Sequence, residues 1–296
     1  MDYTYRIANK TICLQSDIEL IEKEESALFR IASEEVIDMK VRIYHVDELP
    51  KVEGDFVAEA LDTKLYRKNE KLFLITKNRK DDSPIFFAEF SSLQKDKIIL
   101  WALKSEMPHT LRIQVIWSAI NLPYHMLLGD VLTLHSSVIE IGKKTIVFFA
   151  PSGTGKSTQA NLWYQYRNAK QLNGDKTALL CKEEGIYACG LPFCGTSEIC
   201  NQYELPLNAM VFLSQAKKNV IRSMTGMEAL KALLDNCFGY TNVSGCMLKM
   251  IEIASKILEN VPIYALACTP DENAVICLEE QLRKDNRYDN FVQSVD

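Results

Sequence analysis

Residues 148–163 read FFAPSGTGKSTQANLW, and this stretch decides the fold of the second half of the chain. An apolar run (145–150) enters a turn with glycines at positions 153 and 155, and KSTQANLWYQYRN then continues as a helix. Glycine adopts positive φ angles without steric cost, so such a turn can point successive backbone N–H groups inward. The order strand, glycine-rich loop and helix therefore predicts a phosphate-binding loop.

The residues of APSGTGKST (150–158) form the core of a Walker A motif. Lys156 supplies a mobile cation for the outer phosphates, and the Ser157 hydroxyl is placed to bind Mg²⁺. The motif has glycine where this chain has Ala150, which an extended backbone at a strand end tolerates. A plain turn between strand and helix is the alternative, but the offsets of lysine and serine favour phosphate. We predict nucleotide binding by Ser152, Gly153, Thr154, Gly155, Lys156, Ser157 and Thr158.

Composition limits the partners of the chain. It has 47% hydrophobic and 25% charged residues, as in soluble globular proteins, and its net charge of −5 argues against a nucleic-acid binder. Its most apolar run, TIVFFA (145–150), is far shorter than the roughly 20 residues of a membrane helix. The nine cysteines contain no CxxC pair, which favours reduced, buried thiols over a zinc site or disulfides. We expect a cytoplasmic protein with no nucleic-acid or membrane partner.

The first hundred residues read differently from the rest. Strand candidates separated by polar turns occur at 3–15, 41–49, 72–76, 84–90 and 97–103, and 20–35 is either a helix or a loosely ordered charged stretch. This part holds no glycine-rich turn and no metal cluster. We predict an N-terminal β-rich domain (1–105) that serves packing, oligomerisation or partner binding.

The remainder (106–296) reads as α/β. A helix over 109–128 is broken by Pro123, and strands at 132–141 and 145–150 form a hairpin through GKK (142–144). The chain continues with short strands around a turn at KEEG (182–185) and with a buried strand (208–215). It ends with helices (226–237, 246–260), a strand (261–268) and a last helix (271–284).

Two further residues are candidates for chemistry. Asp175 follows Lys156 by nineteen positions (175 − 156), and its carboxylate can hold Mg²⁺ or accept a proton from an attacking hydroxyl. NGD is also an ordinary turn sequence, so local sequence leaves both readings open. His135 lies on the strand that enters the hairpin, where a lone histidine is more often structural than catalytic.

From His135 to Gly195 the chain resembles the catalytic domain of HPr kinase/phosphorylase and the related P-loop of phosphoenolpyruvate carboxykinase. The shared pattern is a strand histidine, a glycine-containing turn, a strand entering SGTGKST, and a strand ending in an acidic residue, here Asp175. The resemblance implies a C-terminal P-loop kinase domain of HPr kinase/carboxykinase type that uses ATP and Mg²⁺. It implies that Asp175 takes the proton from a serine hydroxyl, with His135 and Lys156 beside the reacting phosphate, and that Ser157 and Asp175 bind the metal.

A wider resemblance, over most of 130–285, is to uncharacterised bacterial proteins of this superfamily. They share GLPFCG (190–195), LPLNAMVFLSQAKKN (205–219) and a closing P-x-Y-x-L…P-D (262–271). The two glycines of GLPFCG would let backbone approach the acceptor or the γ-phosphate; the alternative is a bend between strands with a buried thiol.

The chain also departs from the HPr kinases. Thr158 stands where they carry an acidic residue, and Gly174 stands beside Asp175 where they often have a second aspartate. GLPFCG has no arginine, which puts phosphorolysis in doubt, and the four histidines do not assemble the carboxykinase set.

We therefore predict an ATP-dependent kinase that transfers the γ-phosphoryl group to a hydroxyl, most simply Ser or Thr of a peptide or small protein. Two alternatives remain: a nucleotide-responsive binding module, and a carboxykinase-like or small-molecule kinase. The resemblance alone allows a homo-oligomer. The sequence does not name the acceptor.

Overall fold

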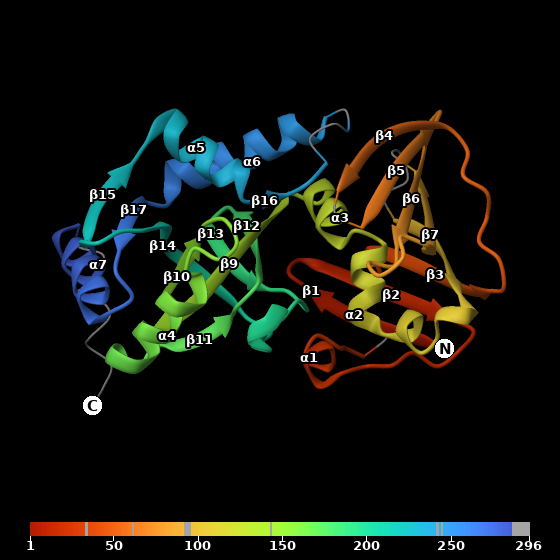
Figure 1. Ribbon diagram of the computed structural model, residues 1–296, viewed down its shortest axis with the longest axis horizontal. Coiled ribbons are helices and arrows are strands. Elements are labelled where there is room, and N and C mark those ends of the chain that lie inside the picture. Colours follow the sequence, from red (N-terminus) through yellow and green to blue (C-terminus); the bar gives the residue numbers. More distant parts are fainter. Residues whose placement is uncertain are drawn as a thin grey trace. The chain divides into compact units, whose positions relative to one another are not determined.

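The computed structural model in Figure 1 describes residues 1–32, 35–60, 62–91, 96–142, 144–240, 243 and 245–285. The chain forms two compact units: Met1–Gly129 with Gly239–Met247, and Asp130–Phe238 with the chain from Leu248 onward. The first unit extends past the predicted boundary at residue 105 because helix α2 (Ile113–Ala119) packs on strands of the first sheet. The side of α2 that meets the sheet is fully buried, so the helix completes the core of this unit.

Eight strands form one sheet in the described part of the first unit, in the order β1-β2-β3-β8-β7-β6-β5-β4. Their bounds are β1 Asp2–Ile7, β2 Lys10–Ser16, β3 Met39–Val46, β4 Asp55–Ala60, β5 Thr63–Lys68, β6 Lys71–Lys77, β7 Pro84–Ser91 and β8 Lys97–Leu103. Burial alternates along β3, as expected for a strand with one face in the core. The strands predicted at 41–49, 72–76, 84–90 and 97–103 are confirmed, whereas the strand expected over 3–15 is the antiparallel pair of β1 and β2, which turns at Ala8 with φ 49°. The sequence missed β4 and β5, whose residues are mostly exposed or half-buried and therefore lack an apolar period.

The predicted helix over 109–128 is two helices, α2 and α3 (Leu122–Leu128). Asn121 lies between them at a left-handed φ of 49°, and its side chain accepts a hydrogen bond from the Tyr124 N–H. Pro123 lies in the first turn of α3, where its missing N–H leaves no helical hydrogen bond unmade. The charged stretch 20–35 contains the four-residue helix α1 (Glu24–Ala27), and 3₁₀ turns lie at Lys104–Glu106 and His109–Leu111.

The sheet of the second unit follows the order β10-β9-β12-β13-β14-β17-β15, and β11 and β16 both pair with β9. Its strands are β9 Val131–Ile141, β10 Lys144–Phe149, β11 Lys170–Asn173, β12 Lys176–Lys182, β13 Gly185–Gly190, β14 Glu204–Gln215, β15 Val220–Met224, β16 Cys237–Phe238 and β17 Ile263–Cys268. Strand β14 runs parallel to both β10 and β17. The carboxyl ends of these three strands therefore meet at one edge of the sheet.

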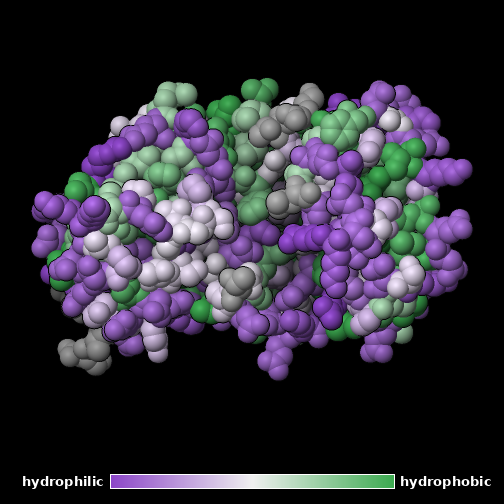
Figure 2. Space-filling model, in the orientation of Figure 1, coloured by the Kyte–Doolittle hydropathy of each residue, from purple (hydrophilic) through white to green (hydrophobic). Residues whose placement is uncertain are grey.

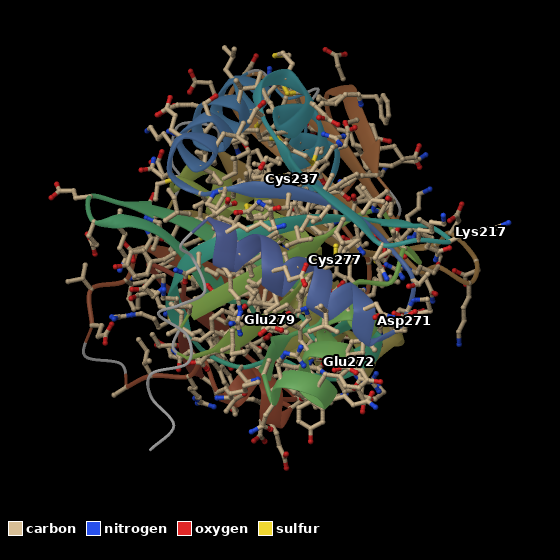
Figure 3. All side chains as sticks on the ribbon, turned by 90° about the vertical axis from the view of Figure 1, so that its left-hand side faces the viewer. Lys217, Cys237, Asp271, Glu272, Cys277 and Glu279 are labelled. Carbon is tan, nitrogen blue, oxygen red and sulfur yellow. The ribbon has the colours of Figure 1, made fainter. Side chains whose placement is uncertain are left out.

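Helices α4 (Lys156–Arg167) and α7 (Glu272–Lys284) pack together, and α4 also contacts β9 and β10. Trp163 of α4 is fully buried in the core between these helices and the sheet, with Ile139, Phe148, Val211, Leu266 and Leu278 among its members. Truncating a buried aromatic of this kind costs about 3–5 kcal/mol, so this core holds α4 firmly in place. Glu272 and Glu279 lie along α7 (Figure 3), and the Arg167 guanidinium pairs with Glu279 at 2.7 Å.

The other predicted elements of the second unit are present. The structure confirms the hairpin of β9 and β10, the β12–β13 pair around the KEEG turn and the buried β14. It also confirms α5 (Gly226–Asp235), α6 (Cys246–Asn260) and α7. Asp271 caps α7 by accepting a hydrogen bond from the Asn273 N–H. Residue 143 of the GKK turn lies outside the described residues.

In Figure 2 the surface over α7, at the left, is largely hydrophilic. None of the helices that the structure describes combines the length and the apolar character needed to cross a bilayer.

Candidate functional site

The glycine-rich loop connects β10 to α4, as predicted, and spans 150–155. Gly153 has φ +77° and Gly155 has φ +114°, and a Cβ atom on Gly153 would meet no heavy atom within 4 Å. Glycine is therefore needed here for its backbone angles and not because a neighbour is close. Ala150 is fully buried and is not among the residues with positive φ, which explains why alanine serves where the motif has glycine.

The amino end of α4 has no side-chain cap. Its N-cap is Gly155, and no side chain accepts from its first turn. The first N–H groups of a helix have no acceptor within the helix, and they lie at the positive end of its dipole. Ser157 and Thr158 are exposed in this turn, and Thr154 closes the loop by donating through Oγ1 to the Pro151 carbonyl at 2.8 Å. An anion at this end would find several unused donors.

Lys156 is folded into the loop. Only 6% of the residue is exposed, and its Nζ donates to the carbonyl oxygens of Ala150 at 2.8 Å and Pro151 at 3.2 Å. Burial lowers the pKa of Lys156, while the negative charge of Asp175 acts in the opposite direction. The two carbonyl oxygens therefore hold the ammonium within the loop.

Asp175 and His135 lie together at the junction of β9 and β12. His135 Nδ1 is 3.1 Å from the Asp175 carbonyl oxygen and 3.4 Å from its Oδ1. The Asp175 carbonyl also accepts from the Ser136 N–H, which ties it to β9. Both groups that face Nδ1 are oxygen acceptors, so Nδ1 is the nitrogen that carries the hydrogen.

The environment of Asp175 favours its ionised form. Burial acts to raise the pKa of this carboxyl, but the hydrogen bond from His135 and the charges of Lys176, His135 and Lys156 outweigh it, so the pKa lies below its usual range. At neutral pH the group is a carboxylate. It can accept a proton or bind a cation, and it cannot donate a proton.

Lys176 is a site residue that the sequence reasoning missed. It lies directly opposite His135 in the β9–β12 pairing, so both side chains project from the same face of the sheet. Its Nζ is 3.8 Å from Asp175 Oδ2, 4.2 Å from the ring centre of Phe193 and 4.8 Å from that of Phe238. The two aromatic faces hold the ammonium beside the carboxylate. Only the strand register brings these residues together, and the sequence does not display it.

Asn173 fixes the turn that presents Asp175. Its Oδ1 accepts from the N–H groups of Asp175 at 2.8 Å and Lys176 at 3.0 Å, and its Nδ2 lies 3.4 Å from the carbonyl oxygens of both Leu191 and Phe193. Asn173 is 1% exposed, so these bonds form in a dry interior. NGD is thus a turn, as one sequence reading held, and this turn also carries the site carboxylate.

The segment GLPFCG lies against Asp175. Gly195 has φ +59°, and a Cβ atom there would lie 2.8 Å from Asp175 Cβ and 3.0 Å from its Cγ. A Cβ atom on Gly174 would likewise lie 2.0 Å from Ser197 Oγ. The two turns pack so closely that only glycine fits at both positions. The Sγ atoms of Cys194 and Cys200, both buried, lie 2.7 Å apart beneath this segment.

A groove of about 310 Å³ opens beside the loop. Its lining comes from the loop and α4 and from the chain at the carboxyl ends of β14 and β17: Thr154, Gly155, Thr158, Gln159, Gln215, Ala216, Cys268, Thr269 and Pro270. Of the predicted loop residues, Thr154, Gly155 and Thr158 therefore border a cavity. The sequence reasoning did not include the residues from β14 and β17, which lie about 60 and 110 positions further along the chain.

Comparison with known proteins gives a likeness to solved structures. No protein-family model matches the chain, and no curated protein matches it. Among solved structures it is similar to the HPr(Ser) kinase/phosphatase from Coxiella burnetii, with 12% sequence identity and a TM-score of 0.31. The similarity covers 52% of this chain and 98% of that chain. The function is therefore inferred from the site itself.

Proposed function

We propose that the second unit is a kinase that transfers the γ-phosphoryl group of ATP to a hydroxyl, with Ser or Thr of a peptide or small protein as acceptor. The observation that carries the proposal is that one unit combines a glycine-rich loop and the uncapped start of α4 with Asp175, an ionised carboxylate held by His135. A phosphate-binding loop alone serves many functions. The Asp175 carboxylate would supply the proton acceptor that transfer to a hydroxyl requires.

The reaction follows from these groups. The proton of the acceptor hydroxyl passes to the Asp175 carboxylate, and the hydroxyl oxygen forms a bond to the γ-phosphorus. The bond between the γ-phosphorus and the β–γ bridging oxygen breaks, and ADP leaves with the electron pair. Lys156 and the N–H groups at the start of α4 offset the negative charge on the transferring group.

His135 acts through Asp175. Its Nδ1–H bonds both to the carboxylate and to the carbonyl of the same residue, so it fixes the orientation of the side chain relative to its own backbone. The bond favours the ionised form of Asp175 before transfer. His135 is in this respect a positioning residue.

The residues present suit Mg²⁺. Ser157 offers an exposed hydroxyl in the first turn of α4, and Asp175 offers an ionised carboxylate, both of them hard oxygen donors. The described residues contain no group of three or more His, Cys, Asp or Glu side chains placed to hold a metal. Mg²⁺ at phosphate sites takes one or two protein oxygens and completes its shell with water and phosphate. When bound, the ion would neutralise charge on the phosphates.

The test is a transfer assay with Mg²⁺, γ-labelled ATP and the peptide fraction of the host's own lysate. Wild type should label a discrete peptide at Ser or Thr, and Asp175→Asn should not, while both bind nucleotide equally. Asp235→Asn, an exposed aspartate at the end of α5, is the matched control and should transfer normally. Nucleotide binding without label in any peptide would overturn the peptide-kinase proposal. It would favour a small-molecule kinase or a nucleotide-gated binding module.

A further inference from the structure

We propose that Cys194 and Cys200 form a reversible disulfide, and that this bond makes the candidate site responsive to peroxide. Both cysteines lie in the stretch that follows β13 and packs beside Asp175. Formation of the bond does not depend on the proposed function. Its effect on phosphoryl transfer does rest on that function.

The two sulfur atoms are already in contact. Cys194 Sγ and Cys200 Sγ lie 2.7 Å apart, and both cysteines are reduced in the structure. A disulfide bond is about 2.05 Å long, so the sulfurs need to approach each other by only about 0.65 Å. The bond can therefore form with little movement of the chain.

A tight turn holds the two cysteines in this arrangement. The Cys194 carbonyl accepts a hydrogen bond from Ser197 Oγ at 2.8 Å, and Ser197 Oγ in turn accepts from the Ile199 N–H at 3.3 Å. These bonds fold the chain between the two cysteines back on itself. The short separation of the thiols is thus a property of the turn and not of two mobile side chains.

The turn is attached to the residues that present Asp175. Cys200 pairs with Asn173 in an antiparallel bridge, and the Gly174 N–H donates to the Ile199 carbonyl at 3.2 Å. A disulfide would close residues 194–200 into a covalent ring that borders this part of the site. Such a ring restricts how far its neighbours can move.

Closing the ring would also displace groups that contact the site. Cys194 stands between Phe193, whose ring centre is 4.2 Å from Lys176 Nζ, and Gly195, which packs against the Asp175 side chain. Movement of Cys194 toward its partner would shift both contacts. Because misplacement of a reacting group by about 1 Å can cost about 10²-fold in rate, we expect the disulfide to slow transfer several-fold.

Hydrogen peroxide supplies the oxidant. The thiolate of one cysteine attacks a peroxide oxygen, so that an S–O bond forms, the O–O bond breaks and water leaves. The sulfur of the other cysteine then attacks the sulfenic acid, the S–S bond forms, and the S–O bond breaks with loss of a second water. Overall the two thiols give up two electrons and two protons, and one peroxide becomes two waters. A dithiol reductant reverses the change by thiol–disulfide exchange.

Burial makes the pair selective for a small oxidant. Cys194 is 8% exposed and Cys200 is 6% exposed, so bulky disulfide reagents have poor access to either sulfur. Burial slows the first step, as it does for other enclosed thiols. The second step takes place between atoms already in contact, so the sulfenic acid is trapped before it can be oxidised further.

The experiment treats the full chain with hydrogen peroxide, blocks the remaining thiols under denaturing conditions, and cleaves after glutamate. Cleavage after Glu198 separates the two cysteines, so the fragments 185–198 and 199–204 should stay joined until a dithiol is added. Cys194→Ala and Cys200→Ala should each abolish the joined pair, which excludes Cys189 of the first fragment. Cys277→Ala, a half-buried cysteine on α7, is the matched control and should still give it.

Two further readouts use the intact protein. Oxidised wild type should unfold at a temperature several degrees higher than the reduced form, because the ring restricts the unfolded chain. Its transfer rate should fall several-fold and recover with dithiol, whereas peroxide should leave the transfer rate of Cys200→Ala unchanged.

The outcomes separate this proposal from the kinase proposal. Fragments that never join, while other cysteines are oxidised, would overturn the disulfide. A joined pair with equal loss of transfer in wild type and Cys200→Ala would overturn its effect on the site. Absence of transfer in the reduced protein would count against the proposed function alone, since the joined fragments and the thermal shift still establish the bond.

Discussion

One nitrogen of His135 is shared between two oxygens of Asp175, because Nδ1 lies 3.1 Å from the carbonyl oxygen and 3.4 Å from Oδ1. A single imidazole thus holds both the backbone and the carboxylate of the residue to which we assign proton acceptance. Loss of the ring would leave the carboxylate in place but free to rotate and harder to ionise.

We therefore expect His135→Ala to reduce transfer by about 10²-fold, at the low end for a group that assists proton transfer, with ATP affinity unchanged. The hydrogen bond from His135 lowers the pKa of Asp175, so its removal raises that pKa. The acid limb of the pH–rate profile should move to higher pH. An unchanged limb with normal turnover would show that the ring is only structural.

Two substitutions of Lys176 distinguish the effect of its charge on Asp175 from the effect of its size. Lys176→Met keeps the length and apolar stem but removes the charge that helps to lower the pKa of Asp175, so the acid limb should move to higher pH. Lys176→Arg keeps the charge and can stack between Phe193 and Phe238, so it should restore the wild-type limb. If methionine and arginine give the same profile, the ammonium has no part in ionising Asp175.

Lys156 is predicted to affect binding far more than folding. Its ammonium is largely buried and its pKa is lowered by that burial, so replacement by methionine removes a group that is costly to enclose. Lys156→Met should lower the affinity for both ATP and tripolyphosphate at least tenfold while the midpoint of thermal unfolding stays close to wild type. Calorimetry and a thermal melt on one preparation check both statements. Retained tripolyphosphate affinity would mean that the lysine does not reach the phosphates.

Gly195→Ala tests the close packing beside Asp175. Alanine at φ +59° would be strained, and its Cβ would lie 2.8 Å from Asp175 Cβ, so Asp175 or the segment must move. We expect a loss of about 1–3 kcal/mol in the free energy of unfolding, and near-complete loss of transfer. Gly185→Ala is the matched control, because Gly185 also has positive φ but its added Cβ would meet nothing within 4 Å. That variant should lose stability and keep its turnover.

The sequence predicted those parts of the site that depend on short spacing. The loop from Ser152 to Thr158 was predicted from two glycines, a lysine and a serine at fixed offsets. The apolar run before it and the helical pattern after it place this loop between a strand and a helix. The nearness of His135 to Asp175 came from resemblance and not from any local pattern. Nothing in the sequence marked Lys176 or Asn173, because their contacts depend on the β9–β12 register and on the fold of 190–195.

The fold, too, was predicted only where the sequence carries a local pattern. Strands with an apolar face, such as β3, were predicted closely, whereas β4 and β5 carry few apolar residues and were missed. A break in the helix was predicted at Pro123, and the structure has it two residues earlier, at the left-handed Asn121, which has no apolar signature. The groove combines residues from three distant parts of the chain, and only the parallel pairing of β10, β14 and β17 brings them to one edge.

The return of residues 239–247 to the first unit has a practical consequence for dividing the protein. Tyr240 is 4% exposed, and its ring centre lies 6.0 Å from that of Tyr124, so it is a core residue of a unit whose other residues end at Gly129. A fragment that stops at residue 129 would lack this piece. One that starts at residue 130 would carry Tyr240 without the core residues that bury it. Separate expression of either unit should therefore remove 239–247 from the fragment of the second unit and join it, through a linker, to the first.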